Sequence, residues 1–586
     1  MKSFSIKIPS VGRVLTLTAF FVCLSACGQN RVLKLKDFAL KATNIYYGDL
    51  DSVDSFDLYF SEATGKVPYV DLVTSLNKLF NSKTFSAKKD GAGLTVVRED
   101  NGAKVHIDPK KKEIIFSDYD LFKMNAGAAS LLDIVVTDDI ITHCDLATYE
   151  NRGEPITVYY GTFLIDMAID KNIALLPLQT FVDVFLSGNT YGAVLYNGDE
   201  IFYVYDKSSL FNDSFERTEL GKKYYSVAPS ELDETLADFN MRELALNLQL
   251  NYGLRELRGI EKFSDWFETH GLLERLSSTD ANEVDLAIKE ICYRYFGDIH
   301  SSFEAHSPYA KFDKEKEREE NQKISTSPSY RRINQSLEDA KETRGSFFPD
   351  GLPGIQKIGD TLYVTFDEFF GNGRDYFEEP LTDDDWDAIL SDYPSSGVDT
   401  FGLIHAANEV VQEDPTIRNV VVDISCNTGG GLDEEVFVAC WLLGFSHLQI
   451  QSGTTGCQSA TSYLADVNFD GEVTKEDNVR DRRLFCLVSD ITFSCGNLLA
   501  SMLKESGRAT LIGSKTGGGA CAVYPTSSAI GTYFNTSSHF RFSAEKNGVF
   551  KDIDDGVSPD YKLTELRSFY NRSDKNGLTA FIKKLY

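Results

Sequence analysis

The segment Thr492-Phe493-Ser494-Cys495-Gly496-Asn497 combines residue types that could carry out acyl transfer. A buried strand is expected to end at Val488, and a helix is expected to begin just beyond Ser494. A hydroxyl at that place lies near the positive end of a helix, among free backbone N–H groups. Acyl transfer requires such an exposed nucleophile beside oxyanion donors. The alternative is a serine that only caps the helix.

Two glycine-rich segments, residues 423–431 and 513–519, also follow predicted strands. Consecutive glycines allow backbone N–H groups to approach a ligand closely. Loops at the carboxyl ends of neighbouring parallel strands meet at one edge of the sheet. Three such loops together therefore favour a functional site over an isolated helix cap.

These segments resemble motifs of the C-terminal processing and tricorn-type serine peptidases. The family patterns D-x-R-x-N-x-G-G, S-A-S-A-S-E and G-x-x-T-x-G are similar to residues 423–430, 493–497 and 513–518. Residues 555–560 resemble G-I-x-P-D, and residues 296–301 resemble D-x-H-[ST]. The resemblance spans roughly residues 230–570. It implies a serine endopeptidase acting on peptides or unfolded proteins, with Ser494 as nucleophile and the N–H groups of Gly429 or Gly430 and of Cys495 as oxyanion donors.

The base that the resemblance implies is His300. Processing peptidases carry a lysine after G-x-x-T-x-G, whereas Gly519 occupies that position here. Lys515 lies on a polar glycine-rich loop that offers no apolar cover to lower its pKa. The tricorn branch uses a histidine, which corresponds to His300, although Ile299 replaces the serine that precedes it.

Several assignments stay open at this stage. Asp552 or Asp554 could replace the acidic residue of the tricorn branch, and we take Asp554 as the catalytic candidate. His306 and His539 are alternative bases. The missing lysine also supports a second class of function, an inactive peptide- or ligand-binding protein on the same scaffold. Labelling by a fluorophosphonate probe would separate the two.

Residues 466–477 match a calcium-binding loop of the EF-hand type, independently of the family. Oxygen ligands occupy positions 1, 3, 5, 9 and 12, a glycine, Gly471, occupies position 6, and a backbone carbonyl is available at position 7. The alternative is an acidic turn. The sequence therefore predicts structural calcium and no organic cofactor, with the ligands Asp466, Asn468, Asp470, Glu472, Thr474 and Asp477.

The N-terminus has the features of an export signal. Basic residues precede a short apolar run from Val14 to Leu24, which ends in Leu24-Ser25-Ala26-Cys27. That box resembles the bacterial lipoprotein cleavage site and implies lipidation of Cys27, hence a membrane anchor outside the cytoplasm, with the outer membrane or cell surface expected. The net charge of -29 argues against nucleic acid as a partner. Cysteine spacing matches no metal–thiolate site, and both disulfides and oligomeric state stay open.

The elements that must position these residues alternate between strands and helices after residue 346, which predicts an α/β fold with a mostly parallel sheet. Before it we expect a helical subdomain that carries the histidine motif and an α+β N-terminal region of two repeated, stalk-like modules. The expected divisions are a signal peptide at 1–27, the repeated region at 28–225, the helical subdomain at 229–310, a charged linker at 311–345 and the peptidase core at 346–586.

Overall fold

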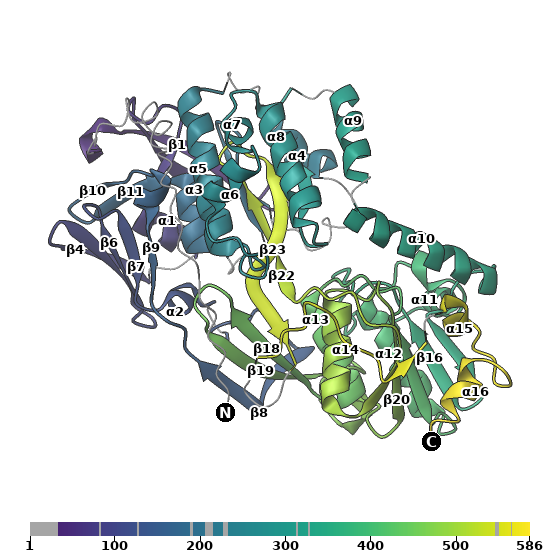
Figure 1. The fold of residues 1–586 in the computed structure, drawn as a ribbon. Coiled ribbons are helices and arrows are strands. Elements are labelled where there is room, and N and C mark those ends of the chain that lie inside the picture. The colour runs from purple at the N-terminus through teal and green to yellow at the C-terminus, as the bar shows by residue number, and fades with distance from the viewer. Residues whose placement is uncertain are drawn as a thin grey trace, which may run out of the picture.

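The computed structural model describes residues 33–586 except 81–83, 126–127, 188–191, 205–214, 227–231, 312–313, 326–327, 545–549 and 564. The expected signal peptide and Cys27 lie outside the described residues. The described part of the chain contains four sheets, with helices packed around them (Figure 1). None of its helices has both the length and the apolar character that crossing a membrane requires.

A six-stranded, mostly parallel sheet carries the C-terminal third of the chain. Its strand order is β15-β16-β17-β20-β21-β24, and all neighbours are parallel except the antiparallel pair β15–β16. The central strand β17 is wholly buried, and β20 is buried except for its first residue, Arg483, as their runs of valine and leucine predict. The strand bounds are β15 Ile355–Ile358, β16 Thr361–Thr365, β17 Asn419–Asp423, β20 Arg483–Val488, β21 Ala509–Gly513 and β24 Tyr561–Lys562.

Three helices connect these strands and cover the sheet: α12 (Thr400–Glu413), α13 (Leu432–Leu443) and α14 (Cys495–Ser506). The last two begin where glycine-rich or serine-containing loops leave β17 and β20. This is the α/β arrangement that the alternation of strands and helices predicted. Both helices thus present their N-terminal ends to one edge of the sheet.

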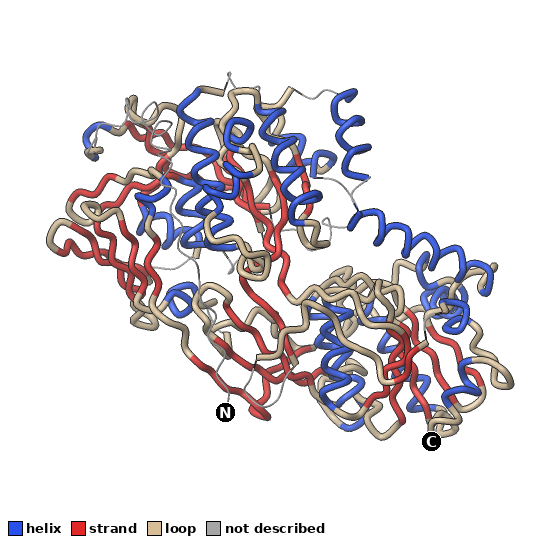
Figure 2. The backbone as a smooth tube through the Cα atoms, viewed as in Figure 1, coloured by secondary structure: helices blue, strands red, loops and turns tan. Residues whose placement is uncertain are grey.

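A second, antiparallel sheet joins distant parts of the chain. Its order is β14-β23-β18-β19-β8, and β22 pairs with β23. Its strands come from all three regions expected at 28–225, 229–310 and 346–586. In the fold these regions are therefore interleaved instead of consecutive. Figure 2 shows the long strands that run between the two halves of the molecule. The bounds are β8 Ile141–Asn151, β14 Ser302–Ala305, β18 Ser446–Ser452, β19 Gln458–Ala465, β22 Cys521–Ser527 and β23 Tyr533–Ser543.

The N-terminal region contains a seven-stranded sheet, ordered β10-β11-β3-β2-β1-β13-β12, and a five-stranded one, ordered β4-β5-β6-β7-β9. The two segments predicted as repeats begin alike: β3 leads into α1 (Leu72–Leu79), and β11 leads into α3 (Leu178–Phe181). They then differ, because the first continues into the β4–β7 meander and the second into the β12–β13 hairpin. The strand bounds are β1 Ala39–Tyr47, β2 Val53–Phe60, β3 Tyr69–Asp71, β4 Phe85–Asp90, β5 Gly93–Arg98, β6 Lys104–Asp108, β7 Glu113–Phe116, β9 Ile156–Val158, β10 Ala168–Asp170, β11 Ile173–Pro177, β12 Ala193–Tyr196 and β13 Ile201–Val204.

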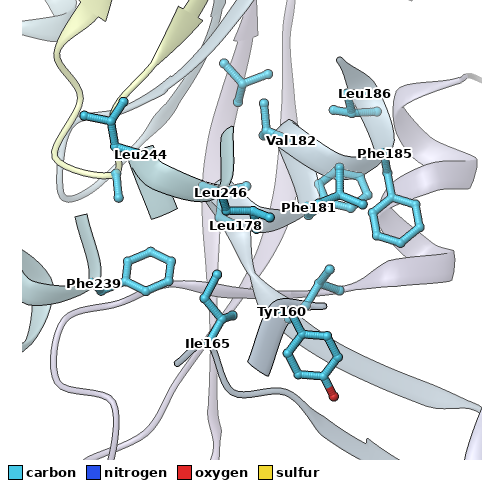
Figure 3. Close-up of a cluster of buried hydrophobic side chains, with 14 of the residues drawn as sticks. Tyr160, Ile165, Leu178, Phe181, Val182, Phe185, Leu186, Phe239, Leu244 and Leu246 are labelled. Atoms are coloured by element: carbon cyan, nitrogen blue, oxygen red, sulfur yellow. The ribbon is translucent and has the colours of Figure 1, made fainter. Parts of the chain in front are cut away.

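The helical segment packs directly against this region. α5 (Glu234–Asn251) begins at Asp233, whose carboxylate accepts the Leu236 N–H, and buries its apolar face against α3 and the turn after it. α8 (Ala281–Glu290) is capped by Asp280 and continues into a π-helical turn, η5 (Ile291–Phe296). The shared core is shown in Figure 3, where the labelled side chains include Phe181, Phe185, Phe239, Leu244 and Leu246.

The segment expected as a charged linker, 311–345, is helical over most of its length. It forms α9 (Lys314–Ser325) and the first part of α10 (Pro328–Phe347). Lysine, glutamate, arginine and glutamine favour helices, so a chain without an apolar pattern can still be helical. Near its end α10 is anchored to the core, because Ala340 is buried and the Arg344 guanidinium pairs with Asp367 at 2.8 Å.

Candidate active site

Ser494 occupies a strained turn between β20 and α14. Its backbone angles are φ 53° and ψ -123°, a region that residues with a side chain rarely adopt. Its side chain makes no helix-capping hydrogen bond. The simple N-cap interpretation therefore does not account for this serine, and the strain instead presents the hydroxyl at the edge of the sheet.

His300 reaches this hydroxyl from the other half of the chain. Its Nε2 atom lies 2.9 Å from Ser494 Oγ, although 194 residues separate the two. With the imidazole proton on Nδ1, the serine hydroxyl donates to Nε2. The ring is buried and packs against Phe493 at a centroid distance of 4.8 Å. The two alternative histidines lie elsewhere: His306 Nδ1 is 3.2 Å from Asp285, and His539 is buried on β23.

The loop that carries His300 is fixed by Asp298. This carboxylate accepts hydrogen bonds from the Ser301 N–H at 2.8 Å, the Tyr252 hydroxyl at 2.9 Å and the Ser537 hydroxyl at 3.0 Å. Asp298 lies within the histidine motif of residues 296–301, but no role was predicted for it. Its position two residues before His300 was the available signal, but the partners on α5, β23 and their flanks could not be seen from the sequence.

Burial and neighbouring charges have opposite effects on the pKa of His300. Burial lowers the pKa of His300, while the nearby charges of Asp298 and Asp554 raise it. Asp554 Oδ1 accepts the Ala520 N–H at 3.0 Å, and Asp552 is engaged in an ion pair with Arg541 at 2.6 Å. Within the described part of the chain, no carboxylate accepts a hydrogen bond from the His300 ring. Of the two aspartates left open, Asp554 is thus the one whose charge acts on His300.

The three predicted loops converge through backbone hydrogen bonds. The Phe493 N–H donates to the Asn427 carbonyl, and the Ser494 N–H donates to the Gly518 carbonyl, each at 3.0 Å. Gly429 comes so close to the serine that an added Cβ would lie 2.5 Å from Ser494 Cβ. A glycine is therefore required there, which is the close approach that the glycine-rich sequence predicted.

The two candidate oxyanion donors of the glycine-rich loop, Gly429 and Gly430, differ in their hydrogen bonds. The Gly429 N–H already donates to Asn427 Oδ1 at 2.9 Å, so it is not available to a ligand. Among the described residues, the N–H groups of Gly430 and Cys495 have no acceptor. The Cys495 thiol donates to the Gly430 carbonyl at 3.2 Å, which ties the two donors together beside Ser494.

Lys515 is paired with another surface residue. Its ammonium pairs with Asp555 at 2.7 Å on the exposed surface. At Gly519, where related motifs have lysine, an added Cβ would lie 2.4 Å from the Phe493 ring. The packing of Phe493 beneath His300 therefore excludes a side chain at that position.

The acidic loop 466–477 has the backbone of the predicted calcium motif. Gly471 has φ 86°, and its N–H donates to Asp466 at 2.7 Å. Asp477 accepts the N–H groups of Val467 and Asn468. Burial raises the pKa of Asp466, and the charges of Asp477 and Asp470 add to the effect. The described residues contain no group of three or more His, Cys, Asp or Glu side chains arranged to hold a metal ion. The turn at Gly471 is the one that the motif predicts, but the carboxylates accept backbone N–H groups, so calcium binding at this loop stays a prediction.

Two further features are the cysteines and a cavity. The eight cysteines in the described ranges are free thiols. A cavity of about 640 Å³ opens where α13 and α14 end, next to Leu443 and Ser506. Because Ser494 lies at the opposite end of α14, this cavity is separate from the serine–histidine pair.

Comparison with known proteins identifies the α/β part. Residues 397–563 match the model of peptidase family S41. No curated protein sequence matches the chain at a significant level.

Several solved structures are similar to parts of this chain. A photosystem II D1 C-terminal processing protease is 23% identical over 37% of this chain and 46% of its own, with a TM-score of 0.25. A putative S41 protease from Bacteroides fragilis is 18% identical over 39% and 56%, with a TM-score of 0.28. A putative peptidase from Parabacteroides merdae is 16% identical over 61% and 97%, with a TM-score of 0.37. The chain thus spans about half the length of the first two, and scores of this size assign no activity.

Proposed function

We propose that this protein is a serine endopeptidase with Ser494 as nucleophile and His300 as general base. The match of residues 397–563 to the model of peptidase family S41 supports this proposal. The observation that carries the proposal is the 2.9 Å contact between His300 Nε2 and Ser494 Oγ on a strained turn. A neutral imidazole beside a serine hydroxyl is the arrangement that activates oxygen for attack on a carbonyl.

The proposed reaction follows from the groups present. His300 Nε2 takes the hydroxyl proton as Ser494 Oγ attacks the peptide carbonyl carbon. The N–H groups of Gly430 and Cys495 stabilise the oxyanion that forms. The imidazolium then protonates the departing amine, which leaves an acyl-enzyme. Water hydrolyses this ester by the reverse sequence of proton transfers, and Ser494 is regenerated.

Asp554 has an electrostatic role in this scheme. Its charge raises the pKa of His300 against the lowering by burial, and it thus stabilises the imidazolium that forms after proton transfer. Asp298 fixes the backbone of the histidine loop through Ser301. The charges of Asp298 and Asp554 both act against the lowering of the His300 pKa by burial.

We also propose the setting and the substrate class. The substrates are peptides or unfolded proteins outside the cytoplasm, and the chain is attached to a bacterial membrane through lipid on Cys27. Support comes from the signal-like N-terminus and its lipoprotein-type box. Calcium at residues 466–477 has a structural role only and takes no part in the reaction.

The test is a double-mutant cycle on peptide hydrolysis. Ser494→Ala and His300→Ala should each lower turnover on the order of 10⁴- to 10⁶-fold, and the double variant should be hardly worse than either, because members of one catalytic unit are strongly non-additive. His306→Ala is the matched control and should retain turnover. Near-normal activity in folded His300→Ala would refute the assignment, and no hydrolysis by the wild-type protein would favour an inactive binding protein.

A further inference from the structure

Residues 566–582 pack against the same parallel sheet that carries Ser494. α15 (Leu566–Tyr570) and α16 (Leu578–Ile582) contribute Phe569, Tyr570 and Leu578 to a separate buried cluster. The sheet side of that cluster includes residues of three strands, Tyr363, Val421 and Leu487. This segment therefore lies directly on the strands β16, β17 and β20 (Figure 1), the last two of which lead into the catalytic loops.

Between the two helices, Arg572 forms a buried ion pair with the end of β17. Its guanidinium lies 2.8 Å from Asp423 Oδ2, and the two side chains are only 2% and 1% exposed. It also donates to Thr365 Oγ1 at 2.8 Å, the last residue of β16. Removing one member of such a pair leaves an uncompensated buried charge. Asp423 thus depends on a residue 149 positions away.

Asp423 in turn holds the first turn of the glycine-rich loop. Its Oδ1 atom accepts both the N–H of Ser425 at 3.1 Å and the Ser425 hydroxyl at 2.6 Å. The Ser425 carbonyl accepts a hydrogen bond from the Ser489 hydroxyl, just after β20. The pair Arg572–Asp423 is therefore connected to the starts of both the glycine loop and the nucleophile loop.

The two loops are then joined further along. The Thr492 hydroxyl donates to the Ile424 carbonyl at 2.8 Å, and the Phe493 N–H donates to the Asn427 carbonyl. These contacts fix the relative position of Ser494 and the Gly430 N–H. A second contact comes from the same C-terminal segment, since the Tyr570 hydroxyl lies 3.2 Å from Cys426 Sγ.

We propose that Arg572 is a positioning residue for the proposed reaction. Its guanidinium holds Asp423 so that the glycine loop and the nucleophile loop keep their catalytic register. Arg572 touches neither the nucleophile nor the base, so it acts on the site through Asp423. The inference rests on the proposed function, because it concerns the geometry of that same site.

The experiment compares Arg572→Ala, Arg572→Lys and the wild-type full chain. The readout is the rate at which a fluorophosphonate labels Ser494, in which the serine oxygen bonds to phosphorus and fluoride leaves. Arg567→Ala is the matched control, since Arg567 is an exposed arginine of α15 whose guanidinium lies over Phe347. Displacing catalytic groups by about 1 Å costs on the order of a hundredfold in rate, and we expect a loss of that size in folded Arg572→Ala. Arg572→Lys should retain part of the labelling rate, because it keeps the positive charge beside Asp423. It should not retain the full rate, because it loses the second hydrogen bond.

Two further readouts separate positioning from general stability. Low concentrations of guanidinium chloride should restore labelling in Arg572→Ala, whereas sodium chloride at the same ionic strength should not. Hydrogen exchange of residues 424–431 should accelerate in Arg572→Ala and stay unchanged in Arg567→Ala. A wild-type labelling rate and wild-type exchange in Arg572→Ala would overturn the proposal and leave the proposed function intact. Absence of labelling in the wild type would instead reject the proposed function, and the exchange measurement would then decide the role of Arg572 alone.

Discussion

At the scale of single residues, the site depends on a histidine whose burial and neighbours act in opposite directions. Burial lowers the pKa of His300, so its neutral form persists into more acidic solution than for an exposed histidine. The acid limb of kcat/KM should therefore lie below pH 6.5, the ordinary pKa of histidine. Activity is present above that limb and is lost as the pH falls through it, because a protonated base cannot accept the serine proton.

Asp554→Asn should move this limb further toward acid. The substitution removes a charge that raises the pKa of His300. Because the pKa is then lower, a more acidic solution is needed to protonate the ring. The pH profile of kcat/KM measures the shift, and Asp555→Asn, which breaks only the exposed pair with Lys515, is the control. An unchanged limb, or one displaced toward alkaline pH, would remove Asp554 from the account.

From the sequence it was easier to predict which residues form the site than which hydrogen bonds they make. The strand–serine–helix pattern and the histidine motif pointed to Ser494 and His300, and the structure brings these two together. The sequence did not distinguish Gly429 from Gly430, because the difference is an amide oxygen of Asn427 that captures one N–H group. It did not reveal Arg572 either, since an ion pair across 149 residues leaves no local pattern.

At the scale of elements, α13 contains a buried acid without a partner. Glu435 is 0% exposed, and among the described residues neither of its oxygens has a hydrogen-bond partner. Burial raises the pKa of Glu435 well above 4.5. The folded state then holds a proton that the unfolded state releases, so stability falls as pH rises above about 4.5 until the pKa of the folded state is reached.

Glu435→Gln should remove this dependence. The variant should melt at a higher temperature than the wild type near pH 8, and the difference should shrink toward pH 4, where both forms are neutral. Each tenfold change in acid dissociation corresponds to about 1.4 kcal/mol of stability. Thermal unfolding at the two pH values measures the effect, with Glu413→Gln, an exposed residue at the end of α12, as control. A lower melting temperature at pH 8 would show that the carboxylate is ionised and satisfied.

The acidic loop between β19 and β20 gives a separate prediction at this scale. Calcium should raise the melting temperature, because a ligand that binds only the folded state stabilises it by about 2.7 kcal/mol at a concentration one hundred times its dissociation constant. Asp470→Asn should weaken the effect by removing one of the charges near Asp466. Magnesium serves as the comparison ion. An unchanged melting temperature in millimolar calcium would mean that the loop is an acidic turn.

Across the whole molecule, the halves are connected by shared sheets. β8 from the N-terminal region pairs with β19, and β14 beside the histidine pairs with β23. Periodicity could predict the parallel sheet and its helices, because their patterns are local. It could not predict this interleaving, which is set by pairing between distant strands. The helices α9 and α10 were not predicted for a different reason, because their sequence shows no apolar face.

A fragment that starts at residue 229 should therefore fail to reach the native state. It would lack β8 and the partners of α5 in the shared core, and β19 would be left as an exposed edge. Circular dichroism and thermal melting of the fragment test this. A cooperative transition like that of the full chain, together with normal labelling of its serine, would show that the α/β part folds on its own.

The proposed mechanism requires that Ser494 is a nucleophile activated by His300. The most direct measurement is the reaction of the full chain with a fluorophosphonate probe, followed by mass spectrometry of the modified peptide. We expect covalent phosphonylation of Ser494, with the proton passing to His300 as fluoride leaves. His300→Ala should label at least about a hundredfold more slowly, since general-base catalysis contributes about that much or more. Folded wild-type protein that remains unlabelled, or that is labelled at a different residue, would contradict the account.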